Sequence, residues 1–200
     1  MTALILDHAR PTAVQALVDR AAEGGHAAFD RLTELYVEGA FRTALAILRS
    51  EADARDAVQE AFVAAWRELP GLRNRAQFEP WLTRILVNRC RSVLRHRRVV
   101  GLREIALDQP EAGGNSDRSH GHSAVDAGAV SQDAIGEADA IRRAFSRLTA
   151  DARVLIVLHH LEERPVAEIA GLLGVPEGTV KWRLHAARAA LERALEAEAR

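Results

Sequence analysis

A row of polar and cationic side chains recurs at helical spacing near the middle of the chain. Successive members lie four, three, four and three residues apart, and they are Arg84, Asn88, Arg91, Arg95 and Arg98. These steps place all of them on one face of an α-helix. Guanidinium groups bind phosphates in a planar, bidentate geometry. The regular spacing therefore favours binding of a nucleic-acid backbone over a merely solvated helix face.

The segment before this row adds cations and aromatic rings. Arg73, Asn74 and Arg75 form a polar loop, and Phe78 and Trp81 follow at the start of the predicted helix. Basic groups beside rings that can stack on bases are the components of a single-strand binding site. The rings can instead belong to the hydrophobic core, and we expect the core for both. Trp81 remains among the candidate DNA-binding residues.

The preceding predicted helix carries an acidic face. Asp53, Asp56 and Glu60 recur at helical spacing, and Gln59 adjoins them. An acidic face alone indicates only solvation. Here it belongs to the same block as the arginine row. A separate acidic face and a separate basic face would suit a protein partner on one side and nucleic acid on the other.

A second DNA-binding pattern lies near the carboxyl terminus. We expect a short helix over 166–173 with Pro165 at its first position, then a turn over 174–178, then a helix from a Thr179 cap to Leu195. Two helices joined by a short glycine-containing turn form a helix-turn-helix, whose second helix fits the major groove. The alternative is an ordinary helical hairpin with a solvated charged face. The residues expected to point outward from the second helix are Lys181, Trp182, His185 and Arg188.

The remaining pattern predicts how the chain is organised. Apolar side chains recur every three or four residues, and no segment shows a strand period. We expect an all-α fold with an N-terminal helical bundle over 14–98 and a C-terminal helix-turn-helix domain over 137–200. The segment 99–136 is rich in glycine and serine, which predicts a flexible linker. Its ends would lie roughly 35 Å apart on average and about 125 Å apart at most.

Composition and charge exclude several classes of protein. The formal net charge is −1, so the whole chain is not a polybasic nucleic-acid binder. Cys90 is the only cysteine, so neither a disulfide nor a cysteine-based zinc site forms within one chain. No apolar run approaches the ~20 residues that span a bilayer, and the amino terminus lacks a signal-peptide pattern. We expect a cytoplasmic protein without membrane insertion.

Two pairs of histidines could suggest metal ligands. His120 and His122 fall in the predicted linker without a third ligand nearby, whereas His159 and His160 are neighbours that point to different faces of a helix. No nucleophile–base pair and no phosphate-cradling loop is recognisable. We therefore expect no metal, no cofactor and no enzymatic activity.

Three segments resemble the extracytoplasmic-function (ECF) RNA polymerase sigma factors. The segment 53–62 reads Asp-Ala-Arg-Asp-Ala-Val-Gln-Glu-Ala-Phe and, with Trp66 following, is similar to that family's polymerase-clamp-binding segment. Residues 78–98 resemble its promoter-melting helix, which reads the −10 element. Residues 148–181, with Gly-Val-Pro and Gly-Thr-Val-Lys, resemble its −35-binding domain. The resemblance covers nearly the whole chain except the first residues and the linker.

The resemblance implies a sigma factor that directs promoter-specific initiation, with core RNA polymerase, promoter DNA and an anti-sigma factor as partners. The loop 72–77 would hold a flipped base of the −10 element, and acidic linker residues would mimic nucleic acid. The polymerase clamp would be met by Asp53, Asp56, Gln59 and Glu60. Promoter DNA would be contacted by Arg73, Asn74, Arg75, Trp81, Arg84, Asn88, Arg91, Arg95, Arg98, Thr179, Lys181, Trp182, Arg183, His185 and Arg188.

The chain departs from the family pattern near its carboxyl terminus. Trp182 and Ala186 replace a usual serine and a usual arginine, and Arg164-Pro165-Val166 replaces an aromatic or serine-containing phrase. These differences concern the −35 contacts. One alternative is a two-domain helix-turn-helix transcriptional regulator, which requires an α/β receiver or a ligand-binding domain. Another is an interaction protein, such as a degenerate sigma homologue or an anti-sigma factor, against which the two cationic faces argue.

Overall fold

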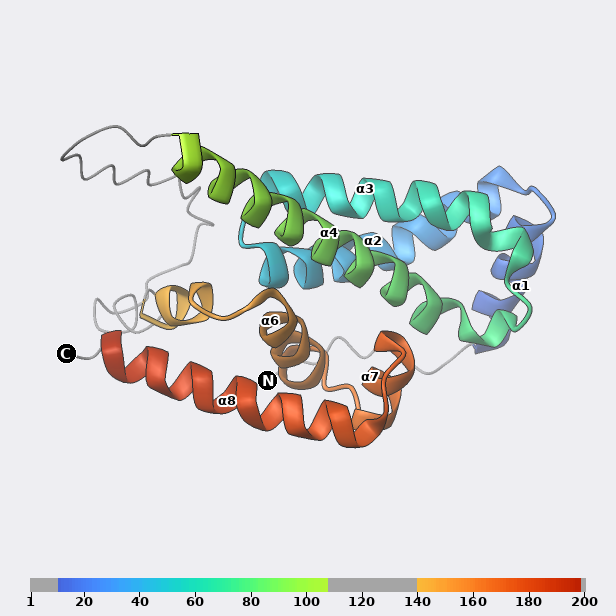
Figure 1. The fold of residues 1–200 in the computed structure, drawn as a ribbon. Coiled ribbons are helices and arrows are strands. Elements are labelled where there is room, and N and C mark those ends of the chain that lie inside the picture. The colour runs from blue at the N-terminus through green and yellow to red at the C-terminus, as the bar shows by residue number, and fades with distance from the viewer. Residues whose placement is uncertain (1–10, 108–139, 199–200) are drawn as a thin grey trace, which may run out of the picture.

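The structure is a computed structural model that describes residues 11–107 and 140–198 (Figure 1). All regular structure within those two ranges is helical. The prediction of an all-α fold with two helical domains is therefore confirmed. Most of the predicted linker lies outside the described residues, including its histidines and Asp108, Glu111 and Asp117, the acidic residues expected to mimic nucleic acid.

The N-terminal domain packs amphipathic helices around a common core. Leu32, Phe62 and Leu86 come from three different helices, and each is almost completely buried. Ser50 caps the third helix, because its hydroxyl oxygen accepts from the Asp53 amide at 3.3 Å. The four helices are α1 (Pro11–Ala22), α2 (His26–Leu48), α3 (Glu51–Glu68) and α4 (Phe78–Leu107).

The connection between α3 and α4 is short and ordered. As expected, α3 stops just before Pro70 and Gly71: it ends at Glu68, and both residues belong to the 3-10 turn η1 (Leu69–Gly71). A second turn, η2 (Arg75–Gln77), leads directly into α4. This arrangement fixes the loop of predicted DNA-binding residues between two rigid helices.

Helix α4 is longer than predicted. It continues to Leu107, past the expected boundary at Arg98. The added segment, 99–107, contains leucine, arginine, glutamate and alanine, which have high helix propensity, and only one glycine. The glycine- and serine-rich composition that predicts a linker begins only after it.

The C-terminal domain contains the predicted helix-turn-helix. A helical segment over 140–146 precedes it. The elements that follow are α6 (Ala150–Ile156), the π-helical turn η3 (Val157–Leu161), α7 (Val166–Leu173) and α8 (Glu177–Glu198). Helix α7 has the expected bounds. Gly174 ends it in the left-handed conformation, with φ of 65°, which glycine adopts without steric cost.

Two details of this motif differ from prediction. Pro165 is the N-cap of α7 and has extended backbone angles, so it precedes the helix rather than occupying its first position. Helix α8 begins at Glu177, and Thr179 lies inside its first turn instead of capping it. The carboxylate of Glu177 suits that first turn, where the helix dipole favours negative charge.

The two domains pack directly on each other. Helix α6 lies between α4 and α8, and α7 also contacts α4 (Figure 1). Buried side chains from both domains, including Phe62, Leu86, Leu158 and Ile169, join one continuous hydrophobic cluster. Periodicity within each helix predicts which face is buried, but it does not predict that the two domains share this cluster.

Cys90 lies in the core of the N-terminal domain. Its side chain is fully buried on α4. Burial, only partly offset by a backbone hydrogen bond, raises the pKa of the thiol to about 12. Since the thiolate is the reactive form, this cysteine is a packing residue and not a nucleophile.

Candidate nucleic-acid and protein interfaces

Helix α4 presents most of the predicted arginine row on one exposed face. Arg84, Asn88 and Arg95 are exposed. Arg91 is only partly exposed, because its guanidinium pairs with Asp151 of α6 at 2.8 Å. Arg98 lies in α4, but its side chain is outside the described part of the structure. We call Arg84, Asn88 and Arg95 the α4 stripe.

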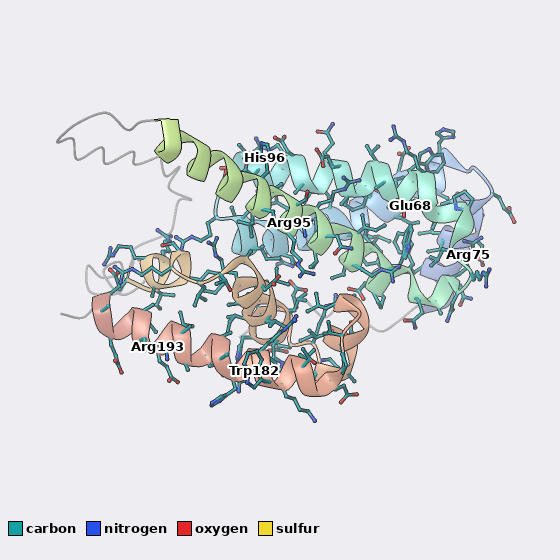
Figure 2. The ribbon with its side chains drawn as sticks, viewed as in Figure 1. Glu68, Arg75, Arg95, His96, Trp182 and Arg193 are labelled. Atoms are coloured by element: carbon teal, nitrogen blue, oxygen red, sulfur yellow. The ribbon has the colours of Figure 1, made fainter. Side chains whose placement is uncertain are left out.

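A hollow of about 590 Å³ separates the α4 stripe from the C-terminal domain. One wall contains all three residues of the stripe, together with Trp81. The opposite wall is the end of α7, residues 171–174. Figure 2 shows Arg95 on α4 and Glu68, another lining residue, on α3. The predicted promoter-binding face is thus turned toward the helix-turn-helix.

The loop before α4 divides into exposed and structural residues. Arg73 is exposed. The Asn74 side chain caps η2 by accepting from the Ala76 amide at 3.2 Å. Arg75 donates to the Leu69 carbonyl oxygen at 2.7 Å and lies 3.7 Å from Asp19 of α1. Asn74 and Arg75 therefore hold the loop in shape, which leaves Arg73 free to contact a ligand.

The two aromatic residues at the start of α4 have different surroundings. Phe78 is 2% exposed, as expected of a core residue. Trp81 is partly exposed, and its ring lies 5.9 Å from the Phe78 ring. One side of Trp81 packs against the core while it also lines the hollow. This placement lets Trp81 support the core and still reach a ligand.

Three of the four residues predicted for the acidic face of α3 are exposed. Asp56, Gln59 and Glu60 are exposed, whereas Asp53 is half-buried and forms an ion pair with Arg97 of α4. The Arg97 guanidinium also donates to the Leu48 carbonyl oxygen at 3.3 Å. Arg97 therefore ties α4 to Asp53 of α3 and to the end of α2. We call Asp56, Gln59 and Glu60 the α3 patch.

An apolar groove beside the α3 patch was not predicted. It has a volume of about 560 Å³, lies between α2 and α3, and includes Gln59 in its lining. Phe29, Phe62 and Trp66 form its floor, with Phe29 and Trp66 rings 5.0 Å apart. Val63 is 43% exposed at its edge. An exposed valine beside an otherwise regular apolar stripe is the sequence signal that could have indicated it.

Helix α8 presents the predicted outer face to solvent. Lys181, His185 and Arg188 are exposed, and Trp182 is 69% exposed (Figure 2). Arg183 is only partly exposed. The face is therefore available to a major groove, with an exposed tryptophan at its amino-terminal end.

Arg188 has a partner that the sequence did not suggest. Its Nε donates to His160 Nε2 at 3.2 Å. Partial burial, followed by the charges of Arg188 and His159, lowers the pKa of His160. A neutral His160 can accept this hydrogen bond and so orient the Arg188 side chain. Among the described residues, no group of three or more His, Cys, Asp or Glu side chains is placed to hold a metal ion.

The family comparisons agree with this geometry. The protein family described as "Sigma-70 region 2" matches residues 32–99, which include the α3 patch and the α4 stripe. The description "Sigma-70, region 4" matches residues 138–191, which include the helix-turn-helix. No helix within the described ranges is long and apolar enough to cross a membrane.

Individual relatives lead to the same family. The ECF RNA polymerase sigma factor SigM of Mycobacterium tuberculosis is 33% identical over 172 residues, which are 86% of this chain and 79% of SigM. The probable RNA polymerase sigma factor RfaY of Xanthomonas campestris is 31% identical over 177 residues, which are 88% of this chain but only 42% of RfaY. The solved structure of CnrH in complex with the cytosolic domain of CnrY is similar with a TM-score of 0.62 and 26% identity, covering 92% of this chain and 98% of that chain. The chain therefore belongs to the ECF RNA polymerase sigma factors, the family that directs RNA polymerase to specific promoters.

Proposed function

We propose that this sigma factor binds the clamp of core RNA polymerase through the α3 patch and binds melted promoter DNA through the α4 stripe. The observation that carries the proposal is the placement of the two surfaces. Exposed acidic and amide groups lie on α3, and exposed arginines lie on the neighbouring α4. A protein with both can hold polymerase and DNA at the same time, because neither ligand needs the other's surface.

The α4 stripe suits the opening of the −10 element. Arg84 and Arg95 would contact phosphates of the separating strands, and Asn88 would offer its amide to a base edge or phosphate. Arg73 and Trp81 would act at the end of the stripe, where a flipped base can stack on a ring. Asn74 and Arg75 would contribute to DNA binding indirectly, because they hold the loop that carries Arg73 in place.

The outer face of α8 suits the −35 element. Lys181, His185 and Arg188 would lie toward phosphates and guanine edges when α8 enters the major groove. Arg183 and Thr179 lie on the flanks of that face and would make peripheral contacts. The protein would act in the cytoplasm as a binding protein without catalysis of its own.

We also propose control by a protein partner of the anti-sigma type. CnrH was solved in complex with the cytosolic domain of CnrY. The apolar groove between α2 and α3 supports this proposal, since a partner that covers it would also approach the α3 patch.

Run-off transcription tests the proposed function. The purified chain and core RNA polymerase are incubated with fragments of genomic DNA, and the start sites are mapped. We expect initiation at a discrete set of sites that share −10 and −35 sequences. Transcription that does not depend on the added chain, or starts without shared upstream sequences, would contradict the proposal.

Trp182 is expected to set part of the −35 preference. Replacing it with serine should change the free energy of unfolding by less than about 1 kcal/mol, because the side chain is 69% exposed. The preferred −35 bases should shift, since each altered base contact is worth about 1–3 kcal/mol. Thermal unfolding and binding to a panel of −35 duplexes measure the two effects.

Ile141→Ser is the matched control for Trp182→Ser. Ile141 is also an exposed apolar residue of the C-terminal domain, at 53% exposure. It belongs to the helical segment 140–146 and not to α8, so its replacement should leave −35 preference unchanged. Unfolding of Trp182→Ser together with an unaltered base preference would show that the tryptophan has a structural role only.

A further inference from the structure

A histidine that precedes the helix-turn-helix holds an arginine of its outer face. His160 lies in the π-helical turn η3, 28 residues before Arg188 of α8. The Arg188 Nε donates to His160 Nε2 at 3.2 Å. Both side chains are exposed, so DNA bound to the outer face of α8 would meet Arg188 while it makes this hydrogen bond.

The hydrogen bond uses only one corner of the Arg188 guanidinium. A guanidinium carries five N–H groups, of which one is on Nε and four are on the two terminal nitrogens. Because Nε is bonded to His160, the two terminal nitrogens form the fork that can approach a ligand end-on. Such a fork matches the O6 and N7 acceptors of guanine, and it also matches two oxygens of a phosphate. The contact therefore selects one of the ways in which an arginine can meet DNA.

The His160 ring is supported by its neighbour in the turn. The His159 ring contacts it edge-on, with centroids 4.8 Å apart and planes inclined by 68°. His159 Nδ1 lies 3.1 Å from the Arg164 carbonyl oxygen, and it must be the donor because a carbonyl oxygen only accepts. We call His159 and His160 the histidine pair. The half-buried member of the pair is thus bonded to the backbone, and the exposed member packs against it.

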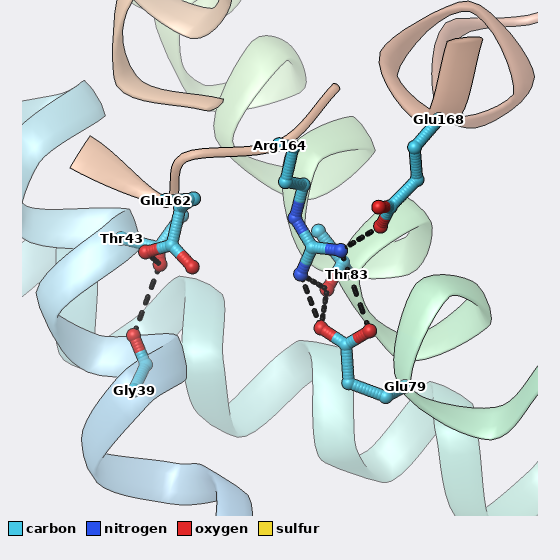
Figure 3. Close-up of polar contacts among 7 residues, drawn as sticks. All are labelled: Gly39, Thr43, Glu79, Thr83, Glu162, Arg164 and Glu168. Atoms are coloured by element: carbon cyan, nitrogen blue, oxygen red, sulfur yellow. Dashed lines mark hydrogen bonds and ion pairs between the residues drawn. The ribbon is translucent and has the colours of Figure 1, made fainter. Parts of the chain in front are cut away.

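Arg164 fixes the carbonyl oxygen that holds the histidine pair (Figure 3). Only 10% of its side chain is exposed, and its guanidinium forms ion pairs with Glu79 of α4 and Glu168 of α7. Its amide donates to the Leu158 carbonyl oxygen at 3.0 Å, which closes the turn within the C-terminal domain. A line of contacts therefore runs from a buried, fully bonded residue out to the DNA-facing surface.

The charge state of His160 decides whether the hydrogen bond forms. Only a neutral imidazole can accept at Nε2, because both nitrogens of the charged ring are donors. Partial burial, followed by the charges of Arg188 and His159, lowers the pKa of His160, which favours the neutral ring at neutral pH. When the pH falls through that lowered pKa, the ring gains a proton, loses its acceptor and repels the guanidinium.

Further charged groups lie on the elements around the histidine pair. Helices α2, α6 and α7 pack on η3, and α8 supplies Arg188. The other charged groups in these parts of the chain are Arg42 on α2, Asp151 and Arg153 on α6, Glu162, Glu163 and Arg164 after the turn, Glu168 on α7, and His185 and Glu192 on α8. His185 is itself a histidine of the outer face, so a test that varies pH must control for its protonation.

We infer that His160 is a positioning residue for recognition of the −35 element, because it orients Arg188 end-on toward DNA. The inference rests on the proposed role of the outer face of α8 in −35 binding. An arginine loses much rotamer freedom when it binds a base edge, and one that is oriented beforehand loses less. His160 therefore sets the strength and the base preference of one contact by acting through Arg188.

His160→Leu in the full chain removes the acceptor and introduces no charge. Its affinity for a −35 duplex should fall about threefold to tenfold, which is the worth of one hydrogen bond. The probe is the −35 duplex defined by the mapped run-off start sites, and its comparison is the same duplex with the −35 bases shuffled. Affinity for the shuffled duplex should change by less than about twofold. Fluorescence anisotropy measures both affinities.

His96→Leu is the matched control for this variant. His96 is an exposed histidine of α4, outside the C-terminal domain, so its replacement should leave both affinities unchanged (Figure 2). Circular dichroism confirms that each variant is folded, and His160→Ala takes the place of a leucine variant that does not fold. An unchanged ratio of the two affinities in a folded variant at His160 would overturn the inference.

His160→Gln separates hydrogen bonding from protonation. Glutamine offers an amide oxygen as acceptor and carries no charge at any pH. The parent should lose −35 specificity as the pH falls from about 8 to about 5.5, whereas His160→Gln should retain it. The loss should persist in His185→Gln, which removes the other histidine of the outer face. The same pH profile in the parent and in His160→Gln would contradict the role of His160.

Arg188→Ala distinguishes failure of the inference from failure of the proposed function. This variant should bind the −35 duplex more weakly, and His160→Leu should then cause no further loss, because its effect passes through Arg188. An equal loss with and without Arg188 would show that His160 is structural or contacts DNA itself, and the inference would fail alone. Unchanged affinity in Arg188→Ala would remove Arg188 from the −35 interface, and the inference with it. Run-off transcription still tests the sigma activity independently of both results.

Discussion

Charge reversal of Asp56 and Glu60 to lysine should abolish tight binding to core RNA polymerase. Both side chains are exposed members of the α3 patch. Each charged contact with a protein partner is worth roughly 1–3 kcal/mol. The double variant should therefore lose about 2–6 kcal/mol of binding free energy, which corresponds to a rise in Kd of about 30-fold or more. Titration of labelled sigma factor with core polymerase measures the change.

The control for this variant must carry the same change in net charge. Glu192 and Glu196 on α8 are exposed and lie four residues apart, as Asp56 and Glu60 do. Their reversal to lysine should leave core affinity within about twofold, because surface charges far from an interface contribute little. Equal loss in both double variants would attribute the effect to net charge, and unchanged affinity of a folded Asp56→Lys/Glu60→Lys protein would remove the α3 patch from the interface.

Alanine at Arg84 and Arg95 should sharply reduce open-complex formation while preserving core binding. Each arginine that contacts a phosphate adds about 0.7–0.9 to the steepness of log affinity against log salt concentration. Loss of both contacts should make this slope shallower by about 1.4–1.8. The structure favours Arg84 and Arg95 for this test over Arg91, whose charge is already paired with Asp151. Holoenzyme binding to a pre-melted promoter across a salt series gives the slopes.

Two exposed arginines elsewhere serve as the comparison. Arg20 and Arg31 are exposed, and they belong to α1 and α2 and not to α4. The variant Arg20→Ala/Arg31→Ala should show the same slope of log affinity against log salt concentration as the parent protein. Parallel salt slopes for Arg84→Ala/Arg95→Ala and for its parent would mean that the α4 stripe is only solvated.

Local periodicity was sufficient to predict the helices and the buried faces. Leu32 and Leu48 of α2 are buried at positions of the predicted apolar stripe, and so are Val180 and Leu184 of α8. Periodicity also predicted that Trp182 points away from the core. These predictions succeed because a helix repeats every 3.6 residues, so its buried face is visible within a short segment.

Contacts between distant segments could not be predicted in this way. The Arg164 guanidinium forms an ion pair with Glu79 of α4, 85 residues away, and nothing in the sequence near either residue indicates the other. Asp53 shows the same limit, because its spacing matches an exposed acidic face but Arg97 of α4 pairs with it. The start of α8 was misplaced for a local reason: threonine is a common cap, yet the chain enters the helix at Glu177 after Pro176.

The hydrophobic cluster that the two domains share makes their packing sensitive to temperature. Separating the domains would transfer apolar surface, including parts of the cluster that joins Leu86 and Leu158, from the interior into water. Exposure of apolar surface raises the heat capacity, and the hydrophobic contribution to the packing of the two domains weakens on cooling. The cost of desolvating the Arg164 ion pairs also falls as temperature rises, which acts in the same direction. Cold should therefore favour separation of the two domains and heat should favour their packing, so that the interface between them responds to temperature.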